Sequence, residues 1–268
     1  PELEFIKTKE NNWVLLKSPD HISDYIKKNG FWGQKETIIA KAFVLNKKNV
    51  NILDIGANIG GFTLPMAKFI SKNNGKVFSF EPQRIIFQQL CANIILNRLD
   101  NVFTYNFALG DKVQKINIPE LDLWKSENSG GLSIDTNIRK KLNEDSEKGL
   151  NFKNFEKENR YNVEQVTLDS LEFSFVINFV KVDIEGYELE FLNGANKTLK
   201  KNDFPPIVYE LWSSKSWYKE KADKINKLLE NWGYNLNIFG KEILAQHPNH
   251  PTQCKITRVG DRVDLKII

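Results

Sequence analysis

Short apolar runs alternate with longer amphipathic stretches along most of this chain. Apolar runs of strand length occupy residues 51–55, 76–80, 102–107, 176–182 and 207–209. Apolar side chains elsewhere recur three or four positions apart, which predicts helices at residues 35–46, 61–72, 84–97, 187–200 and 216–231. Strands that alternate with helices are typical of an α/β protein with a doubly wound, mostly parallel sheet.

The alternation is interrupted at residues 111–165, which are rich in Lys, Glu, Asn and Ser. A polar stretch of this length is either a solvated insertion or a lid that forms one wall of a substrate site. Residues 1–46 are predicted to form a helical N-terminal extension. The tail from residue 234 is predicted to form short strands with turns at Gly240, Pro248 and Gly260-Asp261. No stretch has the composition of a linker, so we expect a single domain over residues 1–268.

Composition and charge restrict the function. The 268 residues include 38 basic and 34 acidic side chains, and a formal net charge of +4 is too mild to indicate a nucleic-acid-binding protein. The two cysteines, Cys91 and Cys254, are too few for a disulfide framework, so we expect a reducing compartment and a cytoplasmic protein. No apolar run reaches about 18 residues, so no transmembrane helix is predicted.

The turn that follows the strand at residues 51–55 is the most informative stretch. The strand carries one acid, Asp54, and leads into the next helix through Gly56, Ala57, Asn58 and Gly60. The following strand ends at Glu81. In α/β folds, a glycine turn below the ligand and an acid at the tip of the next strand hold a nucleoside, with the carboxylate on the ribose hydroxyls. This pattern predicts an adenosine-type cofactor.

Two residues of this stretch distinguish between cofactors. In the dinucleotide fingerprint Gly-x-Gly-x-x-Gly, a glycine would stand where this chain has Asn58, whose side chain obstructs the approach of a pyrophosphate. The carboxylate of Asp54 would repel phosphates and would favour a cofactor with a cationic end. S-adenosylmethionine has an ammonium, a sulfonium and no phosphate, so it fits this turn better than NAD.

Six motifs occur in an order that resembles one protein family. They are Asp54–Gly60, Phe80–Pro82, Asn106–Gly110, Val166–Ser170, Lys181–Gly186 and Pro206–Glu210. Together they resemble the FkbM family of S-adenosylmethionine-dependent methyltransferases over roughly residues 36–212. Residues 111–165 match this family poorly, except at Asn128–Gly130. The resemblance implies a class I methyltransferase fold, which is Rossmann-like with a seven-stranded sheet whose last strand is antiparallel. It also implies O-methylation of a hydroxyl, often on a sugar or a natural product.

The resemblance also implies which residues hold the cofactor. Glu81 would accept both ribose hydroxyls, and Asp54 would bind the ammonium, directly or through water. Asn106 and Ala108 would flank the adenine. The methionine half would be lined by the residues of the turn, which are Gly56, Ala57, Asn58 and Gly60.

Catalysis is expected near the Lys181–Gly186 motif. Asp183, Glu185 and Glu210 compete for the role of the carboxylate that takes the proton of the acceptor hydroxyl. Lys181 would orient the acceptor or serve only as a charge partner of the nearby acids. The three acids could also bind Mg²⁺, but no histidine accompanies them, so no metal site is assigned. Trp212 is interpreted either as a sugar-stacking wall or as a core aromatic residue.

These observations predict an S-adenosylmethionine-dependent O-methyltransferase that acts on a hydroxyl of a glycan or a small metabolite. Nucleic acid is not the expected partner, but two other functions remain open. One is ribose 2′-O-methylation of RNA, which would require a Lys-Asp-Lys-Glu set and a basic groove. The other is a non-catalytic module that binds an adenosine cofactor.

Overall fold

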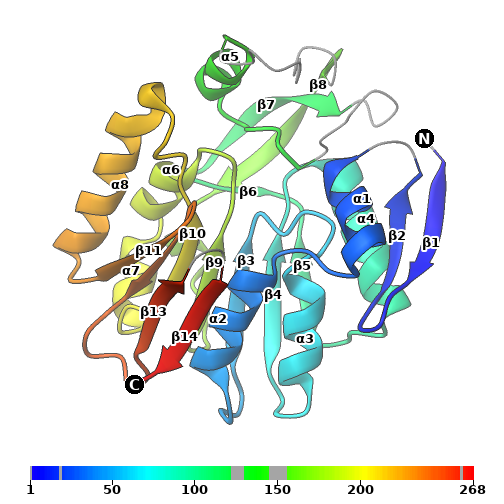
Figure 1. Cartoon of the computed structure of the whole chain (residues 1–268). Coiled ribbons are helices and arrows are strands. Elements are labelled where there is room, and N and C mark those ends of the chain that lie inside the picture. Colours follow the sequence, from blue (N-terminus) through cyan, green and yellow to red (C-terminus); the bar gives the residue numbers. More distant parts are fainter. Residues whose placement is uncertain (1, 18–19, 122–129, 145–155, 260–261) are drawn as a thin grey trace.

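A seven-stranded sheet forms the centre of the molecule (Figure 1). The computed structural model describes residues 2–17, 20–121, 130–144, 156–259 and 262–268. Along the sheet the strand order is β11-β12-β10-β9-β3-β4-β5. In chain order these strands are β3 (Asn51–Ile55), β4 (Lys76–Phe80), β5 (Val102–Tyr105), β9 (Phe179–Val182), β10 (Ile207–Glu210), β11 (Asn235–Phe239) and β12 (Glu242–Gln246).

The strand directions confirm the predicted fold class. From β10 to β5, every pair of neighbouring strands is parallel. Only β12, the last strand of this sheet in the chain, is antiparallel to its neighbours β10 and β11. The carboxyl ends of β3, β4, β9 and β10 therefore meet at one edge of the sheet, where open α/β sheets bind their ligands.

Helices cover both faces of the sheet, so each central strand is buried on both sides. One face packs against α2 (Gln34–Val44), α3 (Thr63–Ser71) and α4 (Arg84–Leu96). The other packs against α6 (Glu188–Asn193), α7 (Asn196–Lys201) and α8 (Lys219–Asn231). Successive residues of a strand point to opposite faces, so Ile52 belongs to the first core and Leu53 to the second. This is why the sequences of these strands are continuous apolar runs.

The N-terminal extension is not wholly helical, so the prediction for residues 1–46 was wrong in part. It begins with an antiparallel hairpin of β1 (Leu3–Lys7) and β2 (Asn12–Leu16), and the helices α1 (His21–Asn29) and α2 follow. The physical reason is visible in β2, where Trp13 and Leu15 are buried at alternate positions. A period of two belongs to a strand that covers a core with one face.

Three predicted elements are divided, shortened or begin differently. The helix expected at residues 187–200 is interrupted at Gly194, where a Cβ atom would lie 1.9 Å from the carbonyl oxygen of Gly110. This close backbone approach requires a glycine and separates α6 from α7. The strand expected at residues 102–107 ends at Tyr105. The helix expected at residues 216–231 begins with one 3₁₀ turn, Ser216–Tyr218, before α8.

The inserted segment forms a second, smaller sheet above the strand ends (Figure 1). Its strands are β6 (Ala108–Leu109), β7 (Gln114–Leu121) and β8 (Glu156–Val166), with β8 in the middle. Helix α5 (Thr136–Glu144) lies between β7 and β8 in the chain, and a 3₁₀ turn, Leu168–Leu171, follows β8. The segment is therefore not simply a solvated loop. Asn128 and Ser129 of the predicted motif lie outside the described residues.

The C-terminal tail consists of short strands, as predicted. Gly240 makes the turn between β11 and β12 at a φ of 89°. The last two strands, β13 (Cys254–Val259) and β14 (Arg262–Ile267), form an antiparallel hairpin. The predicted turn at Gly260-Asp261 lies outside the described residues. Within the described part of the chain, no helix is both long and apolar enough to cross a membrane.

Candidate active site

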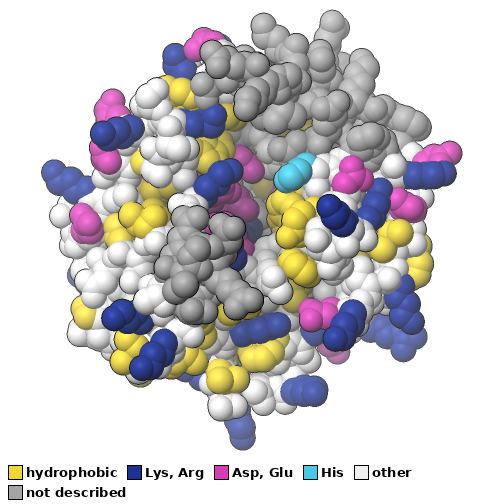
Figure 2. All heavy atoms as spheres, in the orientation of Figure 1, with side chains coloured by type: hydrophobic (Ala, Val, Ile, Leu, Met, Phe, Trp, Pro, Cys, Tyr) yellow, Lys and Arg dark blue, Asp and Glu magenta, His cyan; other side chains and the backbone are white. Residues whose placement is uncertain are grey.

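A cavity of about 590 Å³ lies at the edge of the sheet where the parallel strands end. It is visible as a hollow with acidic side chains at its bottom and hydrophobic side chains on its walls (Figure 2). Among the described residues that line it, six are acidic and three are lysines. The acids are Glu36, Glu81, Asp183, Glu185, Glu210 and Glu242, and the lysines are Lys35, Lys181 and Lys241.

The turn after β3 forms the floor of the cavity, and its backbone geometry requires Gly56. The N–H groups of Gly56 and Ala57 both donate to the carbonyl oxygen of Phe80, at 3.0 and 2.9 Å. Gly56 has a φ of 80°, and a Cβ atom there would lie 1.8 Å from the carbonyl oxygen of Asp183. Only glycine tolerates both the left-handed conformation and the close approach of the β9 strand end.

The remaining residues of the turn differ in what they face. Ala57 and Asn58 line the cavity, as predicted. Gly60 does not line it, because a Cβ atom there would instead meet the side chain of Leu64 in the core. Its φ of 102° shows that it serves the turn itself.

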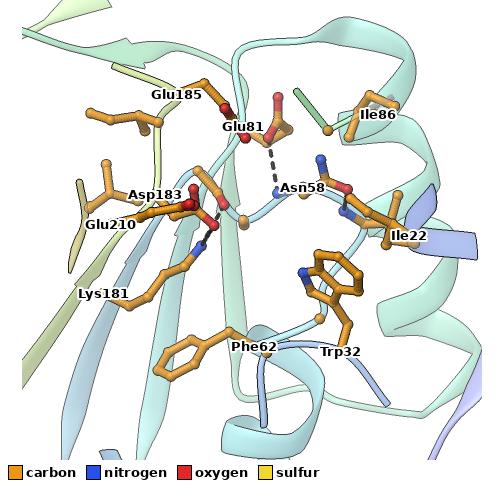
Figure 3. Close-up of a pocket in the computed structure, with 18 of the residues that line it drawn as sticks. Ile22, Trp32, Asn58, Phe62, Glu81, Ile86, Lys181, Asp183, Glu185 and Glu210 are labelled. Atoms are coloured by element: carbon orange, nitrogen blue, oxygen red, sulfur yellow. Dashed lines mark hydrogen bonds and ion pairs between the residues drawn. The ribbon is translucent and has the colours of Figure 1, made fainter. Parts of the chain in front are cut away.

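Glu81 lies at the tip of β4 with its carboxylate in the cavity. Its two oxygens accept the backbone N–H groups of Asn58 at 3.0 Å and of Gln83 at 2.9 Å (Figure 3). Burial raises the pKa of Glu81 to about 7, although both N–H groups favour its charged form. Each carboxylate oxygen offers about two acceptor positions, so one on each oxygen is left for a ligand. The pair could accept the two hydroxyls of a ribose.

Asp54 is placed differently from the prediction. Its carboxylate is fully buried below the floor and does not line the cavity. Thr63 donates a hydrogen bond to Asp54 Oδ2 at 2.5 Å, and Lys181 Nζ lies 3.3 Å from Oδ1. Direct contact with a ligand ammonium is therefore excluded in this arrangement. Strand register explains this placement, because Asp54 and Lys181 are partners on neighbouring parallel strands.

Lys181 is held from three sides at the base of the cavity. Its Nζ donates to the carbonyl oxygen of Gly56 at 2.8 Å and lies 3.6 Å from Asp183 Oδ2. Burial alone would lower the pKa of Lys181, but the charges of Asp54, Asp183 and Glu36 raise it above its ordinary value. The charged lysine thus links the turn to the acids at the ends of β3 and β9.

Of the two residues predicted to flank the adenine, only Ala108 lines the cavity. Asn106 turns away, and its Nδ2 donates to the carbonyl oxygens of Glu81 and Pro82 at 2.8 and 3.2 Å. It therefore fixes the backbone that carries Glu81. The prediction was wrong for Asn106 because the strand ends at Tyr105, which puts its side chain beside the neighbouring strand tip.

Asp183, Glu185 and Glu210 meet in the cavity, as expected (Figure 3). Burial and the charges of Asp183 and Glu210 raise the pKa of Glu185 well above its ordinary value. Burial and the charge of Asp183 raise the pKa of Glu210 to about 7. Glu185 also has a φ of 54°, a conformation that is strained for a residue with a side chain.

Ion pairing separates the three acids. Asp183 lies beside Lys181, and Glu210 Oε1 lies 3.6 Å from Lys241 Nζ. Glu185 makes no hydrogen bond or ion pair to another described side chain. The described residues contain no group of three His, Cys, Asp or Glu side chains placed to hold a metal ion.

Several residues of the cavity were not predicted, and most come from the N-terminal extension. His21 lies with Tyr25 and Trp32 on one wall. The rings of His21 and Tyr25 both meet Trp32 edge to face, at centroid distances of 5.4 and 5.3 Å. Glu36 at the start of α2 adds an acid whose pKa is raised by burial. The aromatic residues between 13 and 32 were the only signal of this wall.

Two other walls of the cavity come from the inserted segment and from the residues after β10. Gly130, Leu132 and Ile134 of the inserted segment line the cavity. Trp212 lines it as well, whereas Tyr218 is buried in the core and donates a hydrogen bond to Glu188 at 2.9 Å. Trp212 therefore faces the cavity, whereas Tyr218 belongs to the core.

The donor set fits an adenosine ligand with a cationic end. Glu81 offers two acceptor positions, the glycine turn leaves room for close approach, and the surrounding acids outnumber the lysines. A polyphosphate would face this excess of carboxylates with no arginine among the described lining residues.

The chain was compared with known proteins. The family model of the methyltransferase FkbM domain matches residues 54–236. A 23S rRNA (uracil(1939)-C(5))-methyltransferase of Marinomonas posidonica is 31% identical over 101 residues, which are 38% of this chain and 22% of that protein. A tRNA(Phe) (4-demethylwyosine(37)-C(7)) aminocarboxypropyltransferase of Methanocaldococcus jannaschii is 39% identical over 61 residues, which are 23% of each protein. The chain thus spans less than a quarter of the length of these curated relatives.

Solved structures of methyltransferases are also similar. An FkbM methyltransferase of Methylobacillus flagellatus aligns with a TM-score of 0.49 and 16% identity, covering 76% of this chain and 45% of that chain. An S-adenosylmethionine-dependent O-methyltransferase of Thermotoga maritima aligns with a TM-score of 0.44 and 12% identity, covering 98% and 71%. Because the FkbM domain match covers most of the chain, this protein belongs to the FkbM methyltransferase family.

Proposed function

We propose that this methyltransferase transfers the methyl group to a hydroxyl of a sugar, a glycan or another small polyhydroxylated metabolite. The observation that carries the proposal is the set of carboxylates at the ends of β9 and β10, which share one cavity with the cofactor turn. A hydroxyl must lose its proton during methyl transfer, and a carboxylate within reach can accept it.

Bound S-adenosylmethionine supplies an electrophilic methyl group on a sulfonium. The chain would hold it with Glu81 on the ribose hydroxyls and with the backbone and side chains of Ala57 and Asn58 along the methionine half. Ala108 would lie against the adenine. Asp54 would act indirectly, by keeping Lys181 charged and the turn in place. Holding the acceptor oxygen about 3 Å from the methyl carbon supplies much of the rate.

Glu185 is our candidate for the general base. Asp183 and Glu210 each lie near a lysine, which pairs with their carboxylates. Glu185 has no such partner among the described side chains, and burial beside other acids raises its pKa. A raised pKa makes the ionised carboxylate a stronger proton acceptor, and the strained backbone of Glu185 is the kind of cost that functional sites retain.

The acceptor is expected to be uncharged or cationic. Glu36, Asp183, Glu210 and Glu242 line the same cavity, and a phosphate or carboxylate on the acceptor would be repelled there. Tyr25, Trp32 and Trp212 offer ring faces and edges for the apolar side of a sugar. Residues 130–134 of the inserted segment complete this wall.

The test begins with radiolabelled S-adenosylmethionine and fractions of metabolites, oligosaccharides and RNA. We expect label in a small polyhydroxylated product as an alkali-stable methyl ether. Glu185→Gln should lower kcat on that product about 10²–10⁴-fold, with the Kd for S-adenosylhomocysteine unchanged within about twofold.

Glu190→Gln is the matched control, because Glu190 lies on α6 outside the cavity and pairs with Lys221 at 2.7 Å. Full activity in Glu185→Gln would reject Glu185 as the base. Label on nitrogen or carbon would reject O-methylation, and binding of S-adenosylhomocysteine without any turnover would favour the non-catalytic module.

Methylation of RNA is the second candidate, because the two curated relatives are named as enzymes of rRNA and tRNA. The acid-lined cavity and the net charge of +4 argue against a polyanionic acceptor. Label in the RNA fraction, together with binding that weakens steeply with salt, would favour this candidate over the first.

A further inference from the structure

We propose that the side-chain amide of Gln83 donates a hydrogen bond to the nucleoside half of S-adenosylmethionine, and that Tyr161 of the inserted segment orients this amide. Gln83 is the N-cap residue of α4, only two positions after Glu81, and it lines the cavity. The inference concerns the cofactor, so it does not depend on which acceptor the enzyme uses.

The orientation of the amide follows from the hydrogen bonds of Tyr161. The tyrosine hydroxyl accepts the backbone N–H of Arg84 at 2.8 Å and lies 3.0 Å from Gln83 Oε1. Its single proton is therefore available for Oε1, which makes that atom the acceptor and places Nε2 on the opposite side. Burial raises the pKa of Tyr161, so the phenol keeps this proton at neutral pH.

The amide nitrogen that results has no partner. Gln83 is only 5% exposed, and its Nε2 is buried without a hydrogen bond to any described residue. A buried donor that stays unpaired is costly. Because Nε2 has almost no accessible surface in the free protein, the Gln83 side chain must turn towards the cavity for a bound ligand to supply the missing acceptor. The nucleoside offers several, in the adenine ring and the ribose, and Glu81 next to it is the residue expected to hold the ribose.

The inserted segment supports this arrangement at a second point. Arg84, the first residue of α4, forms an ion pair with Glu120 of β7 at 3.1 Å, beside the bond from its backbone to Tyr161 on β8. Both strands of the insertion therefore contact the start of α4, where the chain passes the cofactor side of the cavity. The insertion would thus contribute to cofactor binding as well as to the acceptor wall.

The test measures binding of two probes by titration calorimetry: S-adenosylhomocysteine and 5′-methylthioadenosine, which lacks the amino acid half. Gln83→Met removes the donor at similar size and should weaken both probes by the same factor, about three- to tenfold. Tyr161→Phe keeps the amide donor but removes the hydroxyl that orients it. It should weaken the binding of both probes by a smaller factor of about two. Gln88→Met, at an exposed position of the same helix, should bind both like the wild type.

Gln83→Glu covers the case in which Gln83→Met does not fold, because it keeps the acceptor for Tyr161 and replaces only the donor nitrogen. It should bind both probes more weakly than the wild type. Wild-type affinity in Gln83→Met or Gln83→Glu would overturn the proposal. So would a loss for S-adenosylhomocysteine that is absent for 5′-methylthioadenosine, because the contact would then lie on the amino acid half.

Discussion

Asp54 and Glu81 show how far a single residue can be assigned from its position in a motif. Both are acids at the tips of neighbouring parallel strands, yet only Glu81 reaches the cavity. Asp54 is one position before the strand end, so its side chain points between the strand and α3 and meets Lys181 and Thr63. The position relative to the strand end decides between the two roles, because Asp54 lies within β3 whereas Glu81 follows the last residue of β4.

For the single residue Glu81, we predict that its ionisation makes cofactor affinity depend on pH. Its pKa of about 7 in the free protein means that only the ionised fraction offers both acceptor positions. The apparent Kd for S-adenosylhomocysteine should therefore fall about tenfold between roughly pH 6 and pH 8, in proportion to that fraction. Calorimetry across this range measures the effect. Lys181, whose pKa is raised, stays charged throughout.

Glu81→Gln should bind more weakly and lose this pH dependence. Glu210→Gln is the control, because Glu210 also titrates near pH 7 but lies at the acceptor side of the cavity. It should keep the wild-type profile. A pH profile that survives in Glu81→Gln and disappears in Glu210→Gln would contradict the assignment.

Among the elements, helix α4 has an additional function that its amphipathic pattern did not reveal. Gln89, Asn93 and Asn97 lie four residues apart on one face and pair with the backbone of β2. Gln89 donates to Val14 O at 2.7 Å, and Asn93 and Asn97 accept the N–H groups of Val14 and Asn12 at 2.6 and 2.9 Å. These amides replace a further strand on the free edge of the hairpin and keep it from exposing unpaired groups.

Asn93→Ala should be strongly destabilising. Asn93 is fully buried, and its Nδ2 also donates to the carbonyl oxygen of Ile59 in the cofactor turn at 2.9 Å. Its loss would leave two backbone groups unpaired, so the free energy of unfolding should fall by about 2–4 kcal/mol. Denaturant unfolding measures this. Gln88→Ala on the exposed face of α4 should change it by no more than about 0.5 kcal/mol, and an equal effect of both variants would refute the explanation.

In the whole molecule, the cavity is shared between the family domain and segments outside its match. The FkbM match begins at residue 54, whereas His21, Tyr25, Trp32 and Glu36 precede it and line the cavity. The loop that carries Trp32 reaches across to the turn, where a Cβ atom on Gly61 would lie 2.7 Å from the Trp32 ring. Acceptor choice in this chain is therefore expected to depend on its N-terminal extension.

Tyr25→Ala tests this expectation. Tyr25 is 40% exposed and packs against Trp32, so its removal should not unfold the protein. The KM for the acceptor should rise about three- to tenfold, with the Kd for S-adenosylhomocysteine unchanged. Phe5→Ala, at an exposed position of β1 outside the cavity, is the control and should change neither value. A loss of cofactor binding in Tyr25→Ala would contradict the prediction, because Tyr25 would then contact the cofactor and not the acceptor.

The sequence by itself determined the order of strands and helices, the glycine turn and the acids at the ends of β4, β9 and β10. These are local properties, since strand length, helical spacing and the residue at a strand tip are readable without partners. Parallel strands then align their carboxyl ends, so Glu81, Asp183 and Glu210 were expected at one edge.

Only the tertiary structure decided which of these groups face the same space. It buried Asp54 beside Lys181 and turned Asn106 towards the backbone of Glu81 and Pro82. It also brought Tyr25 to the cavity and Tyr161 to the side chain of Gln83. Contacts between segments far apart in the chain depend on strand register and on how each segment packs. Neither leaves a periodic signal in the residues themselves, because pairing across a sheet is set by the whole fold.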